Sequence, residues 1–240
     1  MIIIIPAYQP DYRLVELINE IKNKTSYKIL VVNDGSSKDK EEIFNKIKKD
    51  VILLKHDKNL GKGKAMKTGL NYVLNKMNKE SVIFVDADGQ HIVKDIINIS
   101  SLNDNNSLII GTRDFNLKHV PFRSKFGNRL TSFFVKNKTN KYIKDTQSGL
   151  RLIPFKYIKD IINLDGDRYE YEINVLLYFL YNDINIIEVP IETIYESKKN
   201  ESSHYKCFKD SLKIYKVINN VEKRFNKYWY VVVIYYITIL

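Results

Sequence analysis

The stretch SVIFVDADGQH, residues 81–91, decides how the chain is expected to fold. Its first half is a near-continuous apolar run, which is typical of a strand covered on both faces. Asp86, Asp88 and the amide of Gln90 follow directly after that run. In parallel sheets flanked by helices, ligands bind beyond the carboxyl ends of the strands. The stretch therefore predicts a buried parallel strand that ends at a ligand-binding edge.

The same pattern repeats on both sides of this strand. Apolar runs predict strands at MIIIIP (1–6), YKILVVND (27–34), DVILLKH (50–56) and SLIIGTRD (107–114). Apolar residues at helical spacing lie between them, in residues 14–24, 40–50, 63–77 and 93–102. This alternation indicates an α/β fold whose mostly parallel central sheet is flanked by helices, with a Rossmann-like nucleotide-binding half.

The alternation fades after residue 115. We expect a helix over 126–137, a turn and short strand over 145–154, a helix over 171–182 and a strand over 184–192. An amphipathic helix is expected over 205–225. No repeat or Pro/Gly-rich linker interrupts the pattern, so we predict one domain, residues 1–215. Residues 216–240 are expected to form a C-terminal helix and an apolar tail.

Composition limits the classes of partner. The chain has 39 Lys and Arg against 28 Asp and Glu, a net charge of +11. This excess favours an anionic partner, which can be a nucleic acid, a nucleotide or a lipid surface. Heavy use of Lys, Asn, Ile and Tyr offers a second explanation, a coding bias. The single cysteine, Cys207, excludes an internal disulfide and a cysteine-based metal site.

The two ends of the chain differ in character. No signal peptide is visible, because Met1 runs directly into a short apolar stretch. The segment YWYVVVIYYITIL, residues 228–240, is apolar but too short to cross a bilayer of roughly 30 Å. It can lie in the membrane interface, begin a spanning segment or form a last core strand. Aromatic residues beside the basic segment EKRFNK favour membrane contact.

The polar residues after the strands suggest phosphate chemistry. Asp86 and Asp88 supply oxygen ligands, which suit Mg²⁺ or Mn²⁺ better than zinc, and such an ion would neutralise a departing diphosphate. The alternative is a polar turn that caps a helix. Asp34, in VVNDGSSKD (31–39), can accept hydrogen bonds from a base or ribose, or act as an N-cap. NLGKGKAMKTG (59–69) is no Walker loop, but Lys62 and Lys64 add charge to a helix N-terminus.

Six motifs in order resemble glycosyltransferase family 2. They are PAY (6–8), VVNDGSSKD (31–39), GKGKA (61–65), DADGQH (86–91), GTRD (111–114) and DTQSGLR (145–151). The chain is most similar to the polyprenyl-phosphate sugar synthases of that family. The resemblance implies a GT-A fold and an inverting, metal-dependent transfer from a nucleotide sugar, UDP- or GDP-linked. The acceptor would be a polyprenyl phosphate at the cytoplasmic face of the cell membrane, and no nucleic acid would be bound.

The resemblance also assigns roles to individual positions. Asp88 and Gln90 would hold the metal, and Arg123, in FRSKFGNR, would hold the acceptor phosphate, as a guanidinium can in two places. Arg113 would meet the donor or the acceptor phosphate. The remaining donor contacts would come from Pro6, Tyr8, Val32 and Asp34, at the base and ribose, and from Asp86 and Ala87, at the nucleotide.

The chain departs from the family pattern at three positions. The acidic residue expected shortly after the first motif is absent, since Pro10 stands near it. The late basic pair is altered, with Tyr195 or Glu196 at the arginine position and His204 at the lysine position. His204 would supply a pH-dependent charge to the donor diphosphate, or be an ordinary exposed loop histidine.

The acceptor determines whether a base is needed. A sugar hydroxyl normally needs a carboxylate to remove its proton, whereas a lipid phosphate is already anionic. Glu170, in DGDRYEYE (165–172), is the candidate carboxylate, and we favour a supporting role for it. Asp88, Arg123 and Glu170 are thus the expected catalytic residues. Two alternatives stay open: transfer to a glycan hydroxyl with Glu170 as base, and a basic binding module without catalysis.

Overall fold

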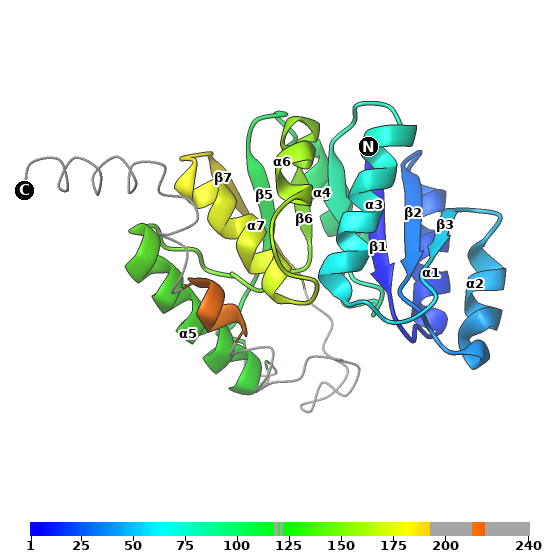
Figure 1. Ribbon diagram of the computed structural model, residues 1–240, viewed down its shortest axis with the longest axis horizontal. Coiled ribbons are helices and arrows are strands. Elements are labelled where there is room, and N and C mark those ends of the chain that lie inside the picture. Colours follow the sequence, from blue (N-terminus) through cyan, green and yellow to red (C-terminus); the bar gives the residue numbers. More distant parts are fainter. Residues whose placement is uncertain (118–119, 121, 193–212, 219–240) are drawn as a thin grey trace, which may run out of the picture.

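The computed structural model describes residues 1–117, 120, 122–192 and 213–218, and for Phe122 and Arg123 the backbone alone. Its centre is a seven-stranded sheet in the order β3-β2-β1-β4-β6-β5-β7 (Figure 1). The strands are β1 (Ile2–Ala7), β2 (Lys28–Asn33), β3 (Ile52–Lys55), β4 (Val82–Phe84), β5 (Leu108–Arg113), β6 (Arg151–Ile153) and β7 (Ile186–Ile191). All neighbouring pairs are parallel except those that β6 makes with β4 and β5. The expected mostly parallel α/β sheet is confirmed.

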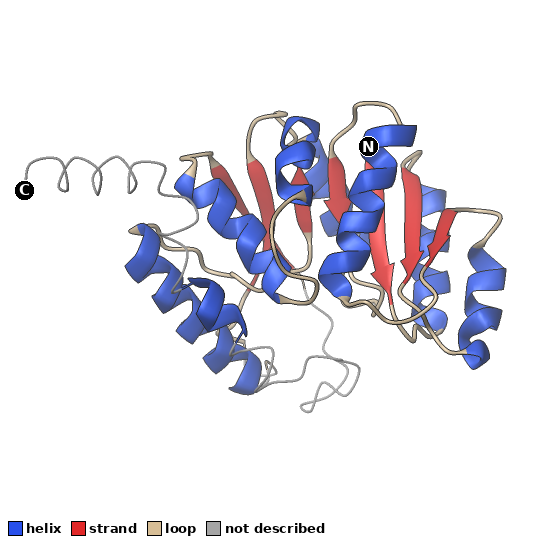
Figure 2. Ribbon diagram, in the orientation of Figure 1, coloured by secondary structure: helices blue, strands red, loops and turns tan. Residues whose placement is uncertain are grey.

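Helices cover both faces of the sheet, as Figure 2 shows. The first face carries α1 (Tyr12–Lys24), α2 (Glu41–Ile47) and α4 (Val93–Ser101), which pack with Ile3 and Ile5 in one core cluster. The second face carries α3 (Lys62–Lys76), α6 (Ile158–Ile162) and α7 (Glu170–Tyr181), which pack with Ile2 and Ile4 in the other. Successive side chains of β1 therefore point to opposite cores, which explains its unbroken apolar sequence.

Two short 3₁₀ turns, η1 (Lys38–Lys40) and η2 (Phe155–Tyr157), lead into α2 and α6. The long helix α5 (Phe122–Thr139) packs against α7 rather than on the sheet face itself. Residues 213–218 are helical and bury Ile214, Val217 and Ile218 in the second core. The expected division after residue 215 falls inside this helix, and residues 219–240 lie outside the described part of the chain. Among the described residues, none of the helices combines the length and apolarity needed to span a bilayer.

Candidate active site

The polar motifs meet at one edge of the sheet, where β1, β2, β4 and β5 end. These four strands run in the same direction, although β6 separates β4 from β5. β6 runs the opposite way, so the loop that leads into it, residues 145–150, arrives at that same edge. The segments that follow β1, β2, β4 and β5, and the segment that precedes β6, therefore surround one site.

Asp34, at the end of β2, holds the loop before α3. Its Oδ1 accepts a hydrogen bond from Leu60 N at 2.9 Å and lies 2.7 Å from His56 Nδ1. Its Oδ2 accepts from Gly61 N at 2.8 Å, and the residue is 2% exposed. Gly61 has a φ of 105°, which a glycine adopts readily. Asp34 thus holds the loop that leads into α3. An N-cap would instead accept hydrogen bonds from the backbone of the residues that directly follow Asp34.

The side of the site next to β1 and β2 is built from two short turns. Pro6 and Val32 lie opposite each other in the β1–β2 register, and Tyr8 follows at the strand end, partly exposed. Gln9 N donates to Ser36 Oγ at 2.9 Å, which ties the two turns together. The four positions expected at the base and ribose therefore belong to adjacent strands.

Lys62, the first residue of α3, joins α7 to residues 86–90, which follow β4 and carry Asp86 and Asp88; we call these residues the acidic tip. Its Nζ lies 2.7 Å from Asp86 Oδ1 and 3.0 Å from Glu172 Oε1. Burial lowers the pKa of Lys62, but the charges of Asp86 and Glu172 more than offset this, so that its pKa is above the usual value. Burial likewise raises the pKa of Asp86, and Lys62 reverses the effect, so Asp86 stays ionised. This triad places one fixed cation beside the first aspartate.

Gly149, just before β6, leaves the space that Asp86 occupies. A Cβ at Gly149 would lie 2.1 Å from Asp86 Oδ2 and 2.6 Å from its Cγ. Real Cβ atoms do not come within 3.0 Å of another heavy atom, so any larger residue would push the carboxylate aside. The glycine of DTQSGLR is thus explained by a close approach and not by an unusual φ.

The pKa of Asp88 is shifted in the opposite direction to that of Asp86. Its Oδ1 accepts from Gln90 N at 3.0 Å, and burial together with the neighbouring charge of Asp86 raises its pKa. A carboxylate in this state gains from a nearby cation. His91 is buried, neither of its ring nitrogens has a hydrogen-bond partner among the described residues, and its Nε2 lies 3.6 Å from Asp86 Oδ2.

A divalent ion fits these residues. Among the described residues no cluster of three His, Cys, Asp or Glu side chains forms a complete metal cage. Mg²⁺ rarely needs one, because it usually binds one or two carboxylates and completes its shell with water and substrate phosphates. Asp88 and Gln90 provide oxygen atoms of the kind such an ion prefers, and because burial and the charge of Asp86 raise the pKa of Asp88, a bound cation would stabilise its ionised form.

Arg113, at the end of β5, is held by a buried carboxylate. Its Nε donates to Asp145 Oδ2 at 2.7 Å and its Nη2 donates to Asp145 Oδ1 at 3.0 Å. Asp145 is fully buried and also accepts from the backbone of Arg113 and Gln147. Such a two-pronged pair fixes the plane of the guanidinium. Arg113 therefore has a defined orientation before any ligand binds.

A second buried guanidinium supports the loop into β6. Arg151 is 1% exposed and donates to the carbonyl oxygens of Thr146, Ser148 and Glu172 at 2.6–2.9 Å. Burial lowers its pKa. Because Arg151 spans from this loop to the carbonyl of Glu172, it fixes the loop against the first turn of α7, where Lys62 also binds.

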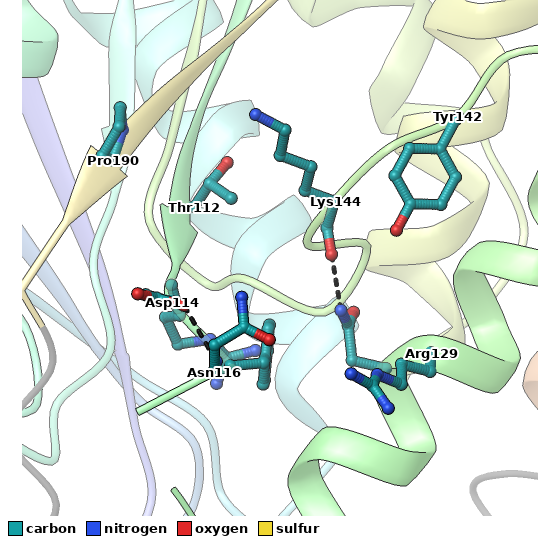
Figure 3. A pocket seen from close by; sticks show the side chains of 10 residues that line it. Thr112, Asp114, Asn116, Arg129, Tyr142, Lys144 and Pro190 are labelled. Carbon is teal, nitrogen blue, oxygen red and sulfur yellow. Dashed lines mark hydrogen bonds between the residues drawn. The ribbon is translucent and has the colours of Figure 1, made fainter. Parts of the chain in front are cut away.

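A pocket of about 520 Å³ opens beside Arg113 (Figure 3). Its walls come from the residues after β5, from α5, from the loop before β6 and from β7. Asn128 Nδ2 donates to the carbonyl of Lys144 at 2.6 Å and so ties α5 to that loop. Arg113, Arg129 and Lys144 make the lining basic, with Asp114 as its acidic member.

A family model described as glycosyl transferase family 2 matches residues 2–162, which include the acidic tip, Arg113 and the loop before β6. The chain belongs to glycosyltransferase family 2. It is therefore an enzyme, and the alternative of a basic module without catalysis is rejected.

Named relatives of this glycosyltransferase agree with the family. It is 31% identical over 214 residues to the UDP-N-acetylglucosamine–dolichyl-phosphate N-acetylglucosaminyltransferase of Methanococcus voltae, covering 80% of this chain and 85% of that one. It is 29% identical over 236 residues to the dolichyl-phosphate beta-glucosyltransferase ALG5A of Trichomonas vaginalis, covering 88% and 72%. Residues 1–349 of S. aureus TarS, solved with UDP-GlcNAc, share the fold at a TM-score of 0.55 and 18% identity, covering 93% and 66%. The expected GT-A fold is confirmed.

The remaining expected site residues of this glycosyltransferase stand as follows. Ala87 lies between the two aspartates and is partly exposed. Glu170 is buried at the start of α7, where its Oε1 accepts from Asp167 N at 3.3 Å and lies 3.9 Å from Lys213 Nζ. The backbone of Arg123 belongs to the first turn of α5, and its side chain is outside the described part. His204 also falls outside the described residues.

Sequence reasoning missed several members of the site. Lys62 was expected to add charge to a helix N-terminus, but its pairing with Asp86 and Glu172 was not foreseen. For Asp145, Gly149 and Arg151 the sequence indicated membership of one motif and no individual role. An acid, a glycine and an arginine in one short segment, DTQSGLR, are the signal that could have suggested a structural role beside the acidic tip.

Proposed function

We propose that this glycosyltransferase moves a sugar from a UDP- or GDP-sugar to a polyprenyl phosphate, with inversion at the anomeric carbon and with Mg²⁺ or Mn²⁺. The proposal depends above all on the different electrostatic surroundings of Asp86 and Asp88 in the acidic tip. Asp86 is already balanced by Lys62 at 2.7 Å, whereas Asp88 lies in a setting that raises its pKa. One aspartate is thus neutralised by the protein, and the other is ready for a cation brought with the donor diphosphate.

The donor would lie across the ends of β1, β2 and β4. Pro6, Tyr8 and Val32 would contact the base and ribose, and Asp34 would act by holding the loop that begins α3. Asp88 and Gln90 would hold the ion, which when bound supplies charge to stabilise the leaving diphosphate. Lys62 would keep the carboxylate of Asp86 in place beside the nucleotide.

The acceptor phosphate would enter from the side of β5. Arg113, oriented by Asp145, and Arg123, from the first turn of α5, would hold it, and His204 would add charge at the donor diphosphate. A phosphate oxygen is anionic at neutral pH and attacks without a base. Glu172 is occupied by Lys62 and one oxygen of Glu170 by the backbone of Asp167, which supports a lipid phosphate acceptor. Two relatives are named as dolichyl-phosphate sugar transferases, which supports a polyprenyl-phosphate acceptor and an association with a membrane. The cytoplasmic face of that membrane is part of our proposal.

One observation favours the second candidate, transfer to a glycan hydroxyl. Within the part of the chain that the structure describes, Glu170 Oε2 is buried and has no hydrogen-bond partner, so it is an acceptor that could take a proton. The variant Glu170→Gln separates the two reactions. It should lose less than about tenfold in kcat if the acceptor is a phosphate, and about 100-fold or more if Glu170 is the base.

The assay incubates the full chain with labelled UDP- and GDP-sugars and a short-chain, water-soluble polyprenyl phosphate, with Mn²⁺ or with EDTA. The proposal expects a labelled lipid that forms with the ion and not with EDTA. Labelled product on an oligosaccharide but on no lipid phosphate, together with an inactive Glu170→Gln variant, would transfer the assignment to the second candidate.

A further inference from the structure

His56, directly after β3, joins the end of β2 to the helix α3. Its backbone N donates to Asn33 O at 2.9 Å, so the pairing of β2 with β3 continues up to this residue. Its side chain is 10% exposed. Nδ1 lies 2.7 Å from Asp34 Oδ1, and Nε2 lies 2.9 Å from Thr68 Oγ1, in the second turn of α3. Both ring nitrogens are therefore bonded to the protein.

The hydrogen-bond roles of the ring follow from the chemistry of its partners. A carboxylate only accepts, so Nδ1 of His56 donates to Asp34. In the neutral imidazole the second nitrogen is then an acceptor, and the hydroxyl of Thr68 donates to it. Turning the ring over would break both bonds. The orientation of His56 is thus fixed from two sides, and its Nδ1 marks one position for the oxygen of Asp34.

Asp34 depends on this support because it is buried and holds a loop. The described residues give its carboxylate three hydrogen bonds, one from His56 and one each from the amides of Leu60 and Gly61. A buried carboxylate is tolerated only where such donors replace water. Without His56, Oδ1 would keep the Leu60 amide alone, and the carboxylate could turn away from the loop. The placement of residues 60–61 therefore depends on the side chain of His56.

Lys62 follows this loop directly, so its position depends on where α3 begins. On the side away from Asp34 the space is narrow, because a Cβ at Gly61 would lie 2.3 Å from Asp167 O. α3 thus starts in a gap between the end of β2 and the segment before α7. From this start the Nζ of Lys62 reaches Asp86 Oδ1 at 2.7 Å. A shift of the loop by about 1 Å would weaken that ion pair.

We propose that His56 is a positioning residue of this glycosyltransferase. By holding Asp34 it fixes residues 60–61, and with them the lysine that pairs with Asp86. Because both of its ring nitrogens bond to the protein, His56 acts through Asp34 and not on a substrate. The structural part of this inference rests on the contacts alone. Its consequence for the rate rests on the proposed function, in which Asp86 lies beside the nucleotide.

The first experiment compares two amide side chains at position 56 by hydrogen exchange of the full chain without substrate. His56→Asn can place its amide nitrogen where Nδ1 stands and keep the bond to Asp34, whereas His56→Gln reaches towards Thr68 in place of Nε2. The backbone amides of Leu60 and Gly61 should exchange about tenfold faster or more in the Gln variant, and within about threefold of the parent in the Asn variant. Equal exchange in the two variants, or an acceleration that spreads equally to β1 and β4, would overturn the proposal.

The second experiment follows the position of Lys62 itself. Its side chain is 19% exposed and paired, whereas Lys64, two residues later, is exposed and serves as an internal reference. Acetylation by a water-soluble succinimidyl ester, followed by mass spectrometry, should modify Lys62 about tenfold faster in His56→Gln than in His56→Asn, relative to Lys64. Equal protection of Lys62 in both variants would contradict a positioning role.

Sugar transfer to a water-soluble polyprenyl phosphate is measured separately. His56→Gln should lose about 100-fold in kcat/KM for the nucleotide sugar, and His56→Asn should stay within about fivefold of the parent. Ser81→Ala is the control, because it removes a buried hydroxyl at the opposite edge of the sheet, where Oγ bonds to Asn103 and Asn105 at 3.2 Å, and it should change kcat/KM by less than about twofold.

The outcomes for His56 and for the reaction can be told apart. Full kcat/KM in His56→Gln would overturn the positioning role even if the parent enzyme transfers sugar as proposed. A parent that transfers no sugar to a lipid phosphate, while the exchange and acetylation of the two variants differ as expected, would end the proposed function and support the structural role of His56.

Discussion

The contact between Gly149 and Asp86 gives the sharpest prediction. In Gly149→Ala the new Cβ would meet Asp86 Oδ2 at 2.1 Å, and ordinary contact begins at 3.4 Å, so the oxygen has to move by about 3.4 − 2.1 = 1.3 Å. The carboxylate is the end of a side chain and can rotate away without moving the backbone. That rotation separates Asp86 from Lys62 and from its position at the edge of the sheet.

The two consequences of this change differ in size. The Lys62–Asp86 pair is partly exposed, at 19% and 27% of the side chains, and alanine restricts the unfolded chain more than glycine. We expect the free energy of unfolding to fall by about 1–2 kcal/mol at most. A displacement of about 1 Å at a reacting centre costs about 100-fold in rate, and we expect at least that loss in kcat/KM for the nucleotide sugar.

The assay compares urea unfolding, followed by circular dichroism, with initial rates of sugar transfer. Gly127→Ala is the matched control, because among the described residues its Cβ would find no heavy atom nearer than Gln147 Oε1 at 3.9 Å. Since Gly127 lies within α5, its replacement should stabilise the fold by up to about 1 kcal/mol and leave the rate unchanged. A Gly149→Ala enzyme with full kcat/KM would refute the reasoning, as would a loss of activity that simply follows unfolding.

Two further variants test the charges of the site. In Asp88→Asn, the metal-free variant should melt above the parent at pH 7, because the raised folded-state pKa of Asp88 means that its ionised form destabilises the fold. The difference should vanish as the pH falls below the unfolded pKa of about 3.9, where Asp88 is protonated in both states, and Mn²⁺ should stabilise only the parent; an equal Mn²⁺ shift in both proteins would contradict the metal assignment. In Asp145→Asn, the guanidinium of Arg113 loses a fully buried partner, and urea titration should show a loss of about 3 kcal/mol. The control is Asp183→Asn, which removes an ion pair with Lys141 in which the side chain of Asp183 is 87% exposed, and it should cost under about 1 kcal/mol. Equal losses in the two variants would argue against a special role for the buried pair.

The strands and helices were predictable where one local pattern sets them. The apolar runs before Asp34, Asp86 and Arg113 are buried on both faces, so continuity of apolar residues was a sufficient signal for β2, β4 and β5. β6 has only three residues, Arg151–Ile153, and nothing local indicates that it enters between β4 and β5 in the opposite direction. The same holds for α6, whose five residues are too few to show a helical period.

The sequence indicated which residues lie together at the strand ends that form the site. It did not indicate which side chains contact each other there. The motifs place Asp34, Asp86 and Arg113 at one edge, and the structure brings them there. Lys62 and Glu172 are 110 residues apart, and no spacing rule connects a lysine at one helix N-terminus with a glutamate in another helix. Such pairs depend on how α3 and α7 pack on the sheet, which only the three-dimensional arrangement shows.

The reversed strand β6 has a consequence for how the chain folds as it leaves the ribosome. β4 and β5 are joined through α4, a connection that ordinarily places two parallel strands side by side. Here a gap has to stay between them until residues 151–153 have been synthesised, so the growing chain carries two uncovered strand edges. We expect a nascent polypeptide that ends near residue 145 to pair those strand edges with wrong segments or to bind a chaperone. Its folding would be completed only when residues 151–153 insert between β4 and β5.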